Sequence, residues 1–355
     1  MTQNGTTRAR YQGLSAARRW RHSPPRPSER FSLAVGDRTG DLTVIGHLAR
    51  GRVSELYQVW SNEHWCALTG KLPSLEASRD GAERSLRHEA DVLRDLRHPN
   101  IVRFFRHESG NDTDRPHLLL EYLAGPSLFD LLEAMPKRRL HVPDAVRAVM
   151  HAGAAVHYLH RRGLLYRDLK PANILLREGV PVLVDFDVVV PLHALPGDRQ
   201  GTAPYMAPEQ VRGETLSPAT DVYGLGVLLF ELLTGKWPTE EPPEEDDEFW
   251  MEEEWDETDP VAEPGRARPA EQMTTSELNR HYPQLAHPPS APRRHNPQVP
   301  VELERILFRC LAIDPADRFQ TVSGFLAALA PLLKGPHRLW PEGAPVERRF
   351  DTESR

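Results

Sequence analysis

The run Tyr166-Arg167-Asp168-Leu169-Lys170-Pro171-Ala172-Asn173 decides the fold class of this chain of 355 residues. Asp168 can accept a proton from a hydroxyl group, and Asn173, five residues later, can offer its amide oxygen to a metal ion. Lys170, two residues after Asp168, can neutralise charge on a phosphoryl group during its transfer. A single surface Asp or Asn is common, so the information lies in the spacing of the three residues. The spacing predicts a site for phosphoryl transfer.

A second carboxylate fits the same chemistry. Asp185 directly follows the apolar run 181–184, twelve residues beyond Asn173. A short apolar run of this kind is typical of a strand, and a strand that ends there would present the carboxylate to Mg²⁺. We therefore predict that Asn173 and Asp185 are the metal ligands.

These residues, with four later motifs, resemble the eukaryotic-like protein kinase superfamily, most closely its bacterial serine/threonine (Hanks-type) branch, over about residues 42–333. Tyr166-Arg167-Asp168 stands where the family has His-Arg-Asp. The other matching motifs are Asp185-Phe186, Gly201-Thr202-Ala203-Pro204-Tyr205-Met206-Ala207-Pro208-Glu209, Asp221-Val222-Tyr223-Gly224-Leu225-Gly226 and Asp314-Pro315-Ala316-Asp317-Arg318-Phe319. In this resemblance Arg318 pairs with Glu209 as a structural ion pair.

The resemblance implies an α+β fold with two lobes. The amino-terminal lobe, about 42–122, would be a small antiparallel sheet with one main helix, and the carboxy-terminal lobe, about 124–335, would be mainly helical. It also implies ATP with Mg²⁺, or Mn²⁺ in its place, and transfer of the γ-phosphoryl group to Ser or Thr of protein substrates. Asp168 would be the catalytic base and Lys170 the phosphate contact.

Hydrophobic periodicity supports this order of elements. Alternating or apolar runs predict strands over 42–48, 55–60, 65–72 and 117–123, and three- and four-residue apolar steps predict a helix over 79–97. The chain then becomes mainly helical, with expected helices at 127–135, 143–162, 219–235, 301–312 and 320–333.

The nucleotide loop and its lysine are less regular. The family's three loop glycines correspond to Ala49, Gly51 and Ser54, so only the middle one is kept. Ser54 precedes Lys71 by 17 residues, the interval usual in the family, and the chain has only five lysines. We therefore assign Lys71, and not Thr69, to the family's catalytic lysine. Its partner would be Glu89 on the following helix.

The resemblance assigns further residues to the nucleotide. Leu120 would be the gatekeeper, and the backbone of Glu121 and Leu123 would bind the adenine edge. The remaining predicted contacts to ATP are Leu48, Leu56 and Leu68.

Two departures from the family bear on mechanism. Asp187 replaces the Gly of Asp-Phe-Gly, and we expect it either to restrict backbone switching or to add a carboxylate near the metal. No Ser, Thr or Tyr lies between Asp185 and Thr202, so Arg167 has no phosphate acceptor there. We therefore predict activity without phosphorylation of this segment, with Asp198 as a candidate fixed carboxylate and Thr202 as a structural residue.

Two stretches are expected to lack structure: an Arg-rich arm over 1–38 and an acidic, Pro-rich insertion over 239–300. Residues 336–355 form a polar tail that is too short to be a domain. Residues 240–259 hold thirteen acidic side chains and no basic one, which favours disorder. This acidic stretch is either a solvated loop, a docking segment for a partner, or a lid that folds onto the arm.

Composition excludes other classes. Cys66 and Cys310 belong to no metal-binding or disulfide spacing, which favours a reducing compartment. No apolar run is long enough to cross a membrane. We expect a cytoplasmic protein whose partners are ATP and protein substrates, with no nucleic acid and no membrane among them.

Two alternatives stay open. A pseudokinase would keep the fold as a nucleotide-binding or scaffold module, which the eroded glycine loop and Asp187 favour. A small-molecule kinase of the aminoglycoside phosphotransferase type has the same catalytic-loop Asp and Asn. It would lack the motifs that end at Glu209 and surround Arg318.

Overall fold

The structure is a computed structural model that describes residues 31–51, 53–75, 77–110, 115–192, 194, 200–239, 278–279 and 282–333. The described residues form two compact units. The first unit holds those up to Pro126 together with Leu175–Asp187, and the second holds Ser127–Ile174 and those from Val188 onward.

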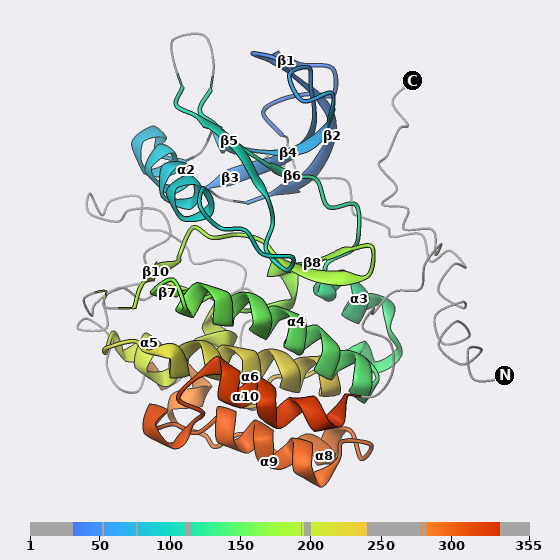
Figure 1. Cartoon of the computed structure of the whole chain (residues 1–355), viewed down its shortest axis with the longest axis vertical. Coiled ribbons are helices and arrows are strands. Elements are labelled where there is room, and N and C mark those ends of the chain that lie inside the picture. Colours follow the sequence, from blue (N-terminus) through green and yellow to red (C-terminus); the bar gives the residue numbers. More distant parts are fainter. Residues whose placement is uncertain are drawn as a thin grey trace, which may run out of the picture. The chain divides into compact units, whose positions relative to one another are not determined.

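An antiparallel sheet of six strands forms most of the first unit, in the order β1-β2-β3-β4-β6-β5 (Figure 1). The strands are β1 (Arg38–Thr39), β2 (Leu42–Arg50), β3 (Ser54–Ser61), β4 (Cys66–Pro73), β5 (Phe104–Glu108) and β6 (His117–Glu121). The sequence pattern predicted β2, β3, β4 and β6 but missed β1 and β5. No residue of β5 is fully buried, so the strand has no apolar face that an alternating sequence pattern would mark.

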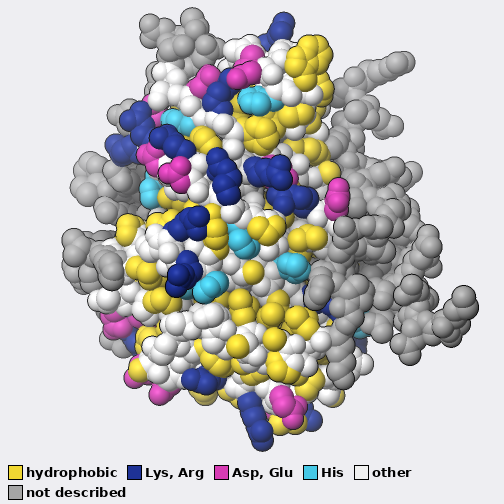
Figure 2. All heavy atoms as spheres, viewed as in Figure 1, with side chains coloured by type: hydrophobic (Ala, Val, Ile, Leu, Met, Phe, Trp, Pro, Cys, Tyr) yellow, Lys and Arg dark blue, Asp and Glu magenta, His cyan; other side chains and the backbone are white. Residues whose placement is uncertain are grey.

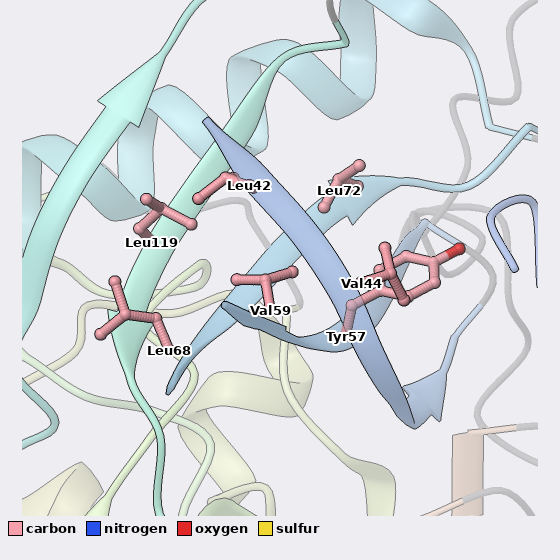
Figure 3. Packing of buried hydrophobic residues seen from close by; sticks show 7 residues of the cluster. All are labelled: Leu42, Val44, Tyr57, Val59, Leu68, Leu72 and Leu119. Atoms are coloured by element: carbon pink, nitrogen blue, oxygen red, sulfur yellow. The ribbon is translucent and has the colours of Figure 1, made fainter. Parts of the chain in front are cut away.

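The interior of this sheet is apolar. Side chains from four strands point into a common core in Figure 3, and they are Leu42, Val44, Tyr57, Val59, Leu68, Leu72 and Leu119. Leu42 and Val44, like Tyr57 and Val59, are two residues apart, so each pair lies on one face of its strand. This alternation fixes the register of the strands.

One main helix packs on the sheet. Helix α2 (Arg79–Leu93) contacts β4, β5 and β6, and it buries Leu86, Ala90 and Leu93. The spacing of these residues at four and three positions is that of a helix face. The helix ends four residues before the predicted position 97.

The beginning of the described chain corrects one expectation. Residues 31–38 were assigned to a disordered arm, but Phe31 and Leu33 pack against the apolar core and β1 pairs with β2. The Arg-rich composition of the arm concealed the short apolar stretch that begins at Phe31. The rest of the arm, up to residue 30, lies outside the described residues.

A second hairpin completes the first unit. Strands β8 (Ile174–Arg177) and β9 (Val180–Leu183) pair with each other, and Leu176 donates its N–H to the carbonyl of Pro126. Gly125 approaches this strand so closely that a Cβ would lie 1.9 Å from the carbonyl oxygen of Leu176. Only glycine fits there.

The second unit is mainly helical (Figure 1). Its α-helices are α3 (Leu128–Ala134), α4 (Val142–His160), α5 (Pro208–Arg212), α6 (Pro218–Thr234), α8 (Pro292–His295), α9 (Val301–Cys310) and α10 (Val322–Leu329). Helix α6 is buried from Ala219 to Thr234 and contacts α4, α9 and α10. At Gly226 a Cβ would lie 2.7 Å from that of Cys310, so the glycine lets α6 and α9 approach closely.

Two short strands and several 3₁₀ turns lie between or after the helices of this unit. Strands β7 (Leu164–Leu165) and β10 (Val190–Pro191) pair with each other. The 3₁₀ turns are η3 (Pro136–Arg138), η4 (Pro171–Asn173), η5 (Ala203–Tyr205), η7 (Pro283–Leu285), η8 (Pro315–Asp317) and η9 (Ala330–Leu332).

The end of the Pro-rich insertion is ordered, contrary to the expectation for 239–300. Residues 282–300 contain η7 and α8 and bury Tyr282, Gln284 and Asn296. Gln284 donates to the carbonyls of Ala203 and Met206 at 2.9 and 3.1 Å. These buried polar contacts anchor a segment whose composition suggests a loop. The acidic stretch 240–259 and the tail 336–355 lie outside the described residues.

Charged and apolar side chains are mixed on the face of the molecule that is shown. On the face shown in Figure 2, Lys and Arg side chains lie among His, Asp, Glu and apolar ones. Among the described helices, none has the length and apolar composition that a membrane span requires.

Candidate functional site

Three ionisable side chains of the first unit meet at Lys71. Strand β4 places Lys71, helix α2 places Glu89, and Asp185 follows β9. Lys71 Nζ lies 2.7 Å from Glu89 Oε2 and 2.8 Å from Asp185 Oδ1. Glu89 is fully buried and also accepts the N–H of Phe186 at 3.1 Å through Oε1. The predicted Lys71–Glu89 pair is therefore formed, and the second oxygen of Glu89 fixes the backbone next to Asp185.

The charge of Lys71 is stabilised by its neighbours. Burial by itself would lower the pKa of Lys71, but the carboxylates of Asp185, Glu89 and Asp187 outweigh burial and raise that pKa well above its ordinary value. Asp187, the residue that replaces the family's glycine, thus adds negative charge to this cluster. The ammonium group is held charged in a nearly closed environment.

The β2–β3 hairpin carries the eroded glycine loop. Ala49 pairs with Leu56, and the N–H of Gly51 donates to the carbonyl of Ser54 at 2.8 Å, which closes the hairpin. Leu56 in turn pairs with Lys71 on β4. The register therefore brings the predicted loop residues and the lysine into one neighbourhood, with Ala49 exposed and Leu48 and Ser54 half-buried.

The end of β6 is held in place by a side chain that sequence analysis missed. The carboxylate of Glu121 accepts two hydrogen bonds from Arg177 on β8, one of them 2.6 Å long from Nε to Oε1. Its carbonyl accepts from the Thr69 hydroxyl at 3.4 Å. Leu120 and Leu123, on either side, are buried. Pairing of Arg177 with Glu121 had no signal in the sequence, because it joins two strands that are far apart in the chain.

In the second unit the catalytic-loop carboxylate has three partners. Asp168 Oδ1 accepts from the Thr202 hydroxyl at 2.7 Å. Asp168 Oδ2 lies 2.8 Å from Lys170 Nζ and accepts from Asn173 Nδ2 at 2.8 Å. Thr202 also accepts from Lys170 at 2.7 Å. The structure thus brings together the three residues predicted from their spacing, and Thr202 joins them from the later motif.

Helix α6 fixes the backbone of this loop. Asp221, which is buried, accepts the N–H groups of Tyr166 and Arg167 at 2.9 and 2.8 Å and contacts His160 Nε2 at 2.7 Å. Arg167 has a φ of 71°, a left-handed conformation that is costly for a residue other than glycine. Two charge-assisted hydrogen bonds to Asp221 offset this strain. His160 was not identified from the sequence.

Arg167 contacts the segment that follows Asp187. Its Nε donates to the carbonyl of Val188 at 2.7 Å, and one of its terminal nitrogens donates to Gln200 Oε1 at 3.4 Å. Gln210 ties the same region together by donating to the carbonyls of Arg167 and Gln200. A carbonyl and an amide oxygen therefore accept from this guanidinium group. Asp198, the candidate carboxylate, lies outside the described residues.

The predicted Glu209–Arg318 pair is present. Arg318 donates from both terminal nitrogens to the two carboxylate oxygens of Glu209 at 2.8 Å, and both residues are buried. Arg318 also donates to the carbonyls of Ala312, Ala219 and Ile313, and Thr220 donates to Glu209. This bidentate geometry is the strong form of such a pair.

The predicted metal ligands fit a hard divalent cation. Asn173 uses Nδ2 for both of its bonds to Asp168, so its amide oxygen faces elsewhere and can serve a metal. Asp185 keeps a partly exposed carboxylate beside Lys71. Oxygen donors of these two kinds suit Mg²⁺. In the described part of the chain, no group of three or more His, Cys, Asp or Glu side chains could hold a metal by itself.

Comparison with known proteins gives the same picture for most of the chain. Residues 42–327 match the family model described as the protein kinase domain. The solved kinase domain of PknI from Mycobacterium tuberculosis superimposes with a TM-score of 0.58 at 23% identity, over 85% of this chain and 99% of that one. At this identity the similarity establishes the fold alone.

Curated relatives are similar in sequence. A probable serine/threonine-protein kinase of Streptomyces coelicolor is 26% identical over 84% of this chain and 43% of its own length. The serine/threonine-protein kinase PknB of Mycolicibacterium smegmatis is 30% identical over 70% of this chain and 36% of its length. An Aurora kinase of Eremothecium gossypii is 33% identical over 58% and 56%, respectively. The chain thus matches between about a third and somewhat over half of these relatives.

Proposed function

Because the chain belongs to the protein kinase domain family, we propose that it is an active serine/threonine protein kinase that transfers the γ-phosphoryl group of Mg·ATP to Ser or Thr of protein substrates. The names of its relatives support this activity. The chain matches less than half the length of these relatives.

The observation that carries the proposal is the environment of Asp168. Its Oδ2 is engaged by Lys170 and Asn173, whereas Oδ1 accepts one hydrogen bond from Thr202. A carboxylate oxygen has two lone-pair positions, so Oδ1 keeps one for the hydroxyl of a substrate. An oriented carboxylate with one open acceptor position is what a catalytic base requires.

Lys170 has a role of its own. Its Nζ is held between Asp168 and Thr202 and is partly exposed, so it can also contact a phosphate oxygen. A positive charge fixed beside the base stabilises the negative charge on a phosphoryl group during transfer. The Thr202 hydroxyl bonds to both the Asp168 carboxylate and the Lys170 ammonium group, and so fixes the distance between them. This supports a structural role for the hydroxyl.

The residues of the first unit would bind and orient the nucleotide. Lys71, kept charged by Glu89 and Asp185, would contact the α- and β-phosphates. The backbone of Glu121 and Leu123 would bind the adenine edge, with Leu120 as the gatekeeper. The apolar contacts would come from the residues Leu48, Leu56 and Leu68, and the loop residues would be Ala49, Gly51 and Ser54.

Mg²⁺ would be held by Asp185 and Asn173. When bound, it would supply neutralisation of charge on the β- and γ-phosphates. The amide oxygen of Asn173 and the partly exposed carboxylate of Asp185 support this assignment. Mn²⁺, which has similar ligand preferences, could replace it.

We further propose that activity needs no phosphate on the segment between Asp185 and Thr202. In related kinases the arginine that corresponds to Arg167 pairs with such a phosphate. In this chain Arg167 donates to the Val188 carbonyl and to Gln200. Because the segment has no Ser, Thr or Tyr, it cannot supply a phosphate to Arg167, and the contacts to Val188 and Gln200 need none.

The second candidate is a pseudokinase that binds nucleotide without transferring phosphate. The substitutions Ala49, Ser54 and Asp187 at glycine positions favour it. It would still need Lys71 and Asp185 for binding but not Asp168, so loss of Asp168 separates the two candidates. A cytoplasmic location and a docking role for residues 240–259 remain predictions.

A transfer assay with γ-labelled ATP on the purified chain tests the proposal. Wild type should label itself or a general protein substrate, and Asp168→Asn and Lys71→Met should each lower the rate by at least about 100-fold. Nucleotide binding, measured separately by calorimetry, should survive in Asp168→Asn. Absence of transfer by the wild type with intact nucleotide binding would favour the pseudokinase.

A further inference from the structure

A segment ahead of the kinase-family match is built into the sheet. The family match begins at residue 42, yet residues 31–37 already contact β2. Gly36 donates its N–H to the carbonyl of Val44, and Val44 donates back to that of Asp37, both over 2.9 Å. This reciprocal pair continues the antiparallel ladder of β1 and β2 in the amino-terminal direction.

An aromatic cluster holds the start of this segment. The Phe31 ring stacks on the His47 ring at 4.2 Å with an interplanar angle of 6°, and it meets the Tyr57 ring edge-on at 5.4 Å. His47 Nε2 lies 2.8 Å from the carbonyl oxygen of Leu33. The rings of His47 on β2 and Tyr57 on β3 therefore both contact Phe31, so both strands of the glycine-loop hairpin hold the segment.

Ser32 contacts a carboxylate with no solvent exposure. Glu55 is 0% exposed, and it accepts from the Ser32 N–H at 3.2 Å as well as from the Ser32 hydroxyl. Its other donors are the Tyr57 hydroxyl and Arg50 Nε, the latter at 3.2 Å. A buried carboxylate is costly unless it is hydrogen-bonded, and Ser32 supplies two of the donors.

Glu55 lies next to the turn of the glycine-loop hairpin. It follows Ser54 directly and pairs across the hairpin with Arg50 in the strand register. Its carboxylate therefore joins both strands of the hairpin to the segment that contains Ser32. Arg115 extends this network, because it donates to the Ser32 hydroxyl and to the carbonyl of Pro73 at the end of β4.

We propose that Ser32 is a positioning residue for the nucleotide loop: through Glu55 it fixes the β2–β3 hairpin, and residues 31–37 are thus a functional extension of the kinase domain. The inference that this affects ATP rests on the proposed function. Ser32 touches no predicted catalytic side chain, so it acts on where the loop lies and not on the chemical step. Loss of its hydroxyl would loosen the hairpin and weaken binding of the ATP phosphates.

Hydrogen exchange on the full chain without nucleotide tests the structural half of the proposal. Ser32→Ala should speed amide exchange at Gly51 and Ser54–Leu56 by about tenfold, since the buried charge of Glu55 loses one of its hydrogen bonds. Ser32→Thr keeps the hydroxyl and should restore slow exchange. Val35→Ala, in the same segment at a side chain that is 62% exposed, is the matched control and should change nothing.

Steady-state kinetics test the functional half. Ser32→Ala should raise KM for ATP about three- to tenfold and leave kcat within about twofold, because uniform binding is lost without loss of transition-state contacts. An equal rise of exchange throughout the sheet, or an unchanged hairpin and unchanged KM in Ser32→Ala, would overturn the proposal. If the wild type transfers no phosphate, the proposed activity fails, while exchange at the hairpin still decides whether Ser32 positions it.

Discussion

The hydroxyl of Thr202 donates to Asp168 Oδ1 at 2.7 Å and accepts from Lys170 Nζ at the same distance. One side chain from the motif Gly201–Glu209 thus links the proposed base to the proposed phosphate contact. This link makes Thr202 a part of the catalytic geometry, although the threonine itself has no acid or base chemistry at neutral pH.

Removing this hydroxyl should slow phosphoryl transfer. Thr202→Val keeps the volume and shape of the side chain but cannot form either bond, and we expect kcat to fall by about tenfold or more because the base loses its orientation. Thr202→Ser keeps the hydroxyl and should retain most of the activity. Initial rates with γ-labelled ATP measure both variants, and full activity in Thr202→Val would remove the assigned role.

Phosphatase treatment should leave the enzyme active. Arg167 donates to Val188 and Gln200, and the segment before Thr202 carries no residue that accepts phosphate. We expect the rate to change by less than about twofold after complete dephosphorylation, because no phosphate-dependent ion pair is lost. The measurement is a rate before and after treatment, with intact mass as the control. Stoichiometric, activating phosphate at Thr202 would contradict the prediction.

Replacing Asp187 separates two explanations for its presence. Its charge contributes to the raised pKa of Lys71, the residue that we propose contacts the ATP phosphates. We expect Asp187→Asn, which removes the charge alone, to raise the Mg²⁺ concentration for half-maximal activity about two- to fivefold. Asp187→Gly removes the charge and also frees the backbone.

The comparison of these two Asp187 variants is informative by itself. Equal effects in Asn and Gly would assign the role to charge, and an effect in Gly alone would assign it to backbone restriction. If Asp187→Gly leaves ATP affinity, Mg²⁺ dependence and turnover unchanged, both explanations are wrong.

The fold class was predictable because the residues of the catalytic loop lie close together in the sequence. The catalytic-loop spacing led to the family. The family match and the solved kinase domain confirm the protein kinase fold, and the curated relatives confirm the serine/threonine kinase resemblance. Apolar periodicity located α2 and α9, each of which buries one face, whereas α4 and α6 were located as apolar stretches that are buried over most of their length. The pair Glu209–Arg318 was predicted because each residue belongs to a motif that matches the kinase family.

Contacts that depend on tertiary packing were not predictable. Arg177 and Glu121 pair across two hairpins, and no periodicity links them. Ser32 was predicted to lie in a disordered arm because the residues before it are rich in Arg, Pro and Ser and have no hydrophobic period. The order in 282–300 comes from buried side-chain amides of Gln284 and Asn296, whose partners are backbone carbonyls that carry no residue-specific signal.

Breaking the Glu209–Arg318 pair should destabilise the second unit strongly. Arg318 is 0% exposed, and its loss would leave a buried, uncompensated carboxylate. We expect Arg318→Met to lower the free energy of unfolding by about 3–5 kcal/mol. The control is Arg94→Met, which removes a pair with Asp91 between side chains that are 60% and 58% exposed and should cost at most about 1 kcal/mol. Thermal or urea unfolding measures both, and equal costs would refute the assigned importance of burial.

Acid should remove the stabilising effect of Glu55. Burial by itself would raise the pKa of Glu55, but hydrogen bonds from Ser32, Tyr57 and Arg50 outweigh burial and lower that pKa below its ordinary value of 4.5. A carboxyl group whose pKa is lower in the folded chain stabilises the fold above its unfolded pKa. That stability is lost as the pH falls through the folded pKa.

The wild type should therefore exceed Glu55→Gln in unfolding free energy at pH 7, and the difference should shrink as the pH falls below about 4.5. Asp95→Asn, at an exposed carboxylate of the same unit, is the control and should show a small difference at every pH. Urea unfolding at a series of pH values from 7 to 3 measures the three proteins. Because the Ser32 hydroxyl is one of the donors to Glu55, Ser32→Ala should reduce the same pH-dependent difference. A pH-independent difference between wild type and Glu55→Gln would mean that the carboxylate stabilises the hairpin by shape and not by charge.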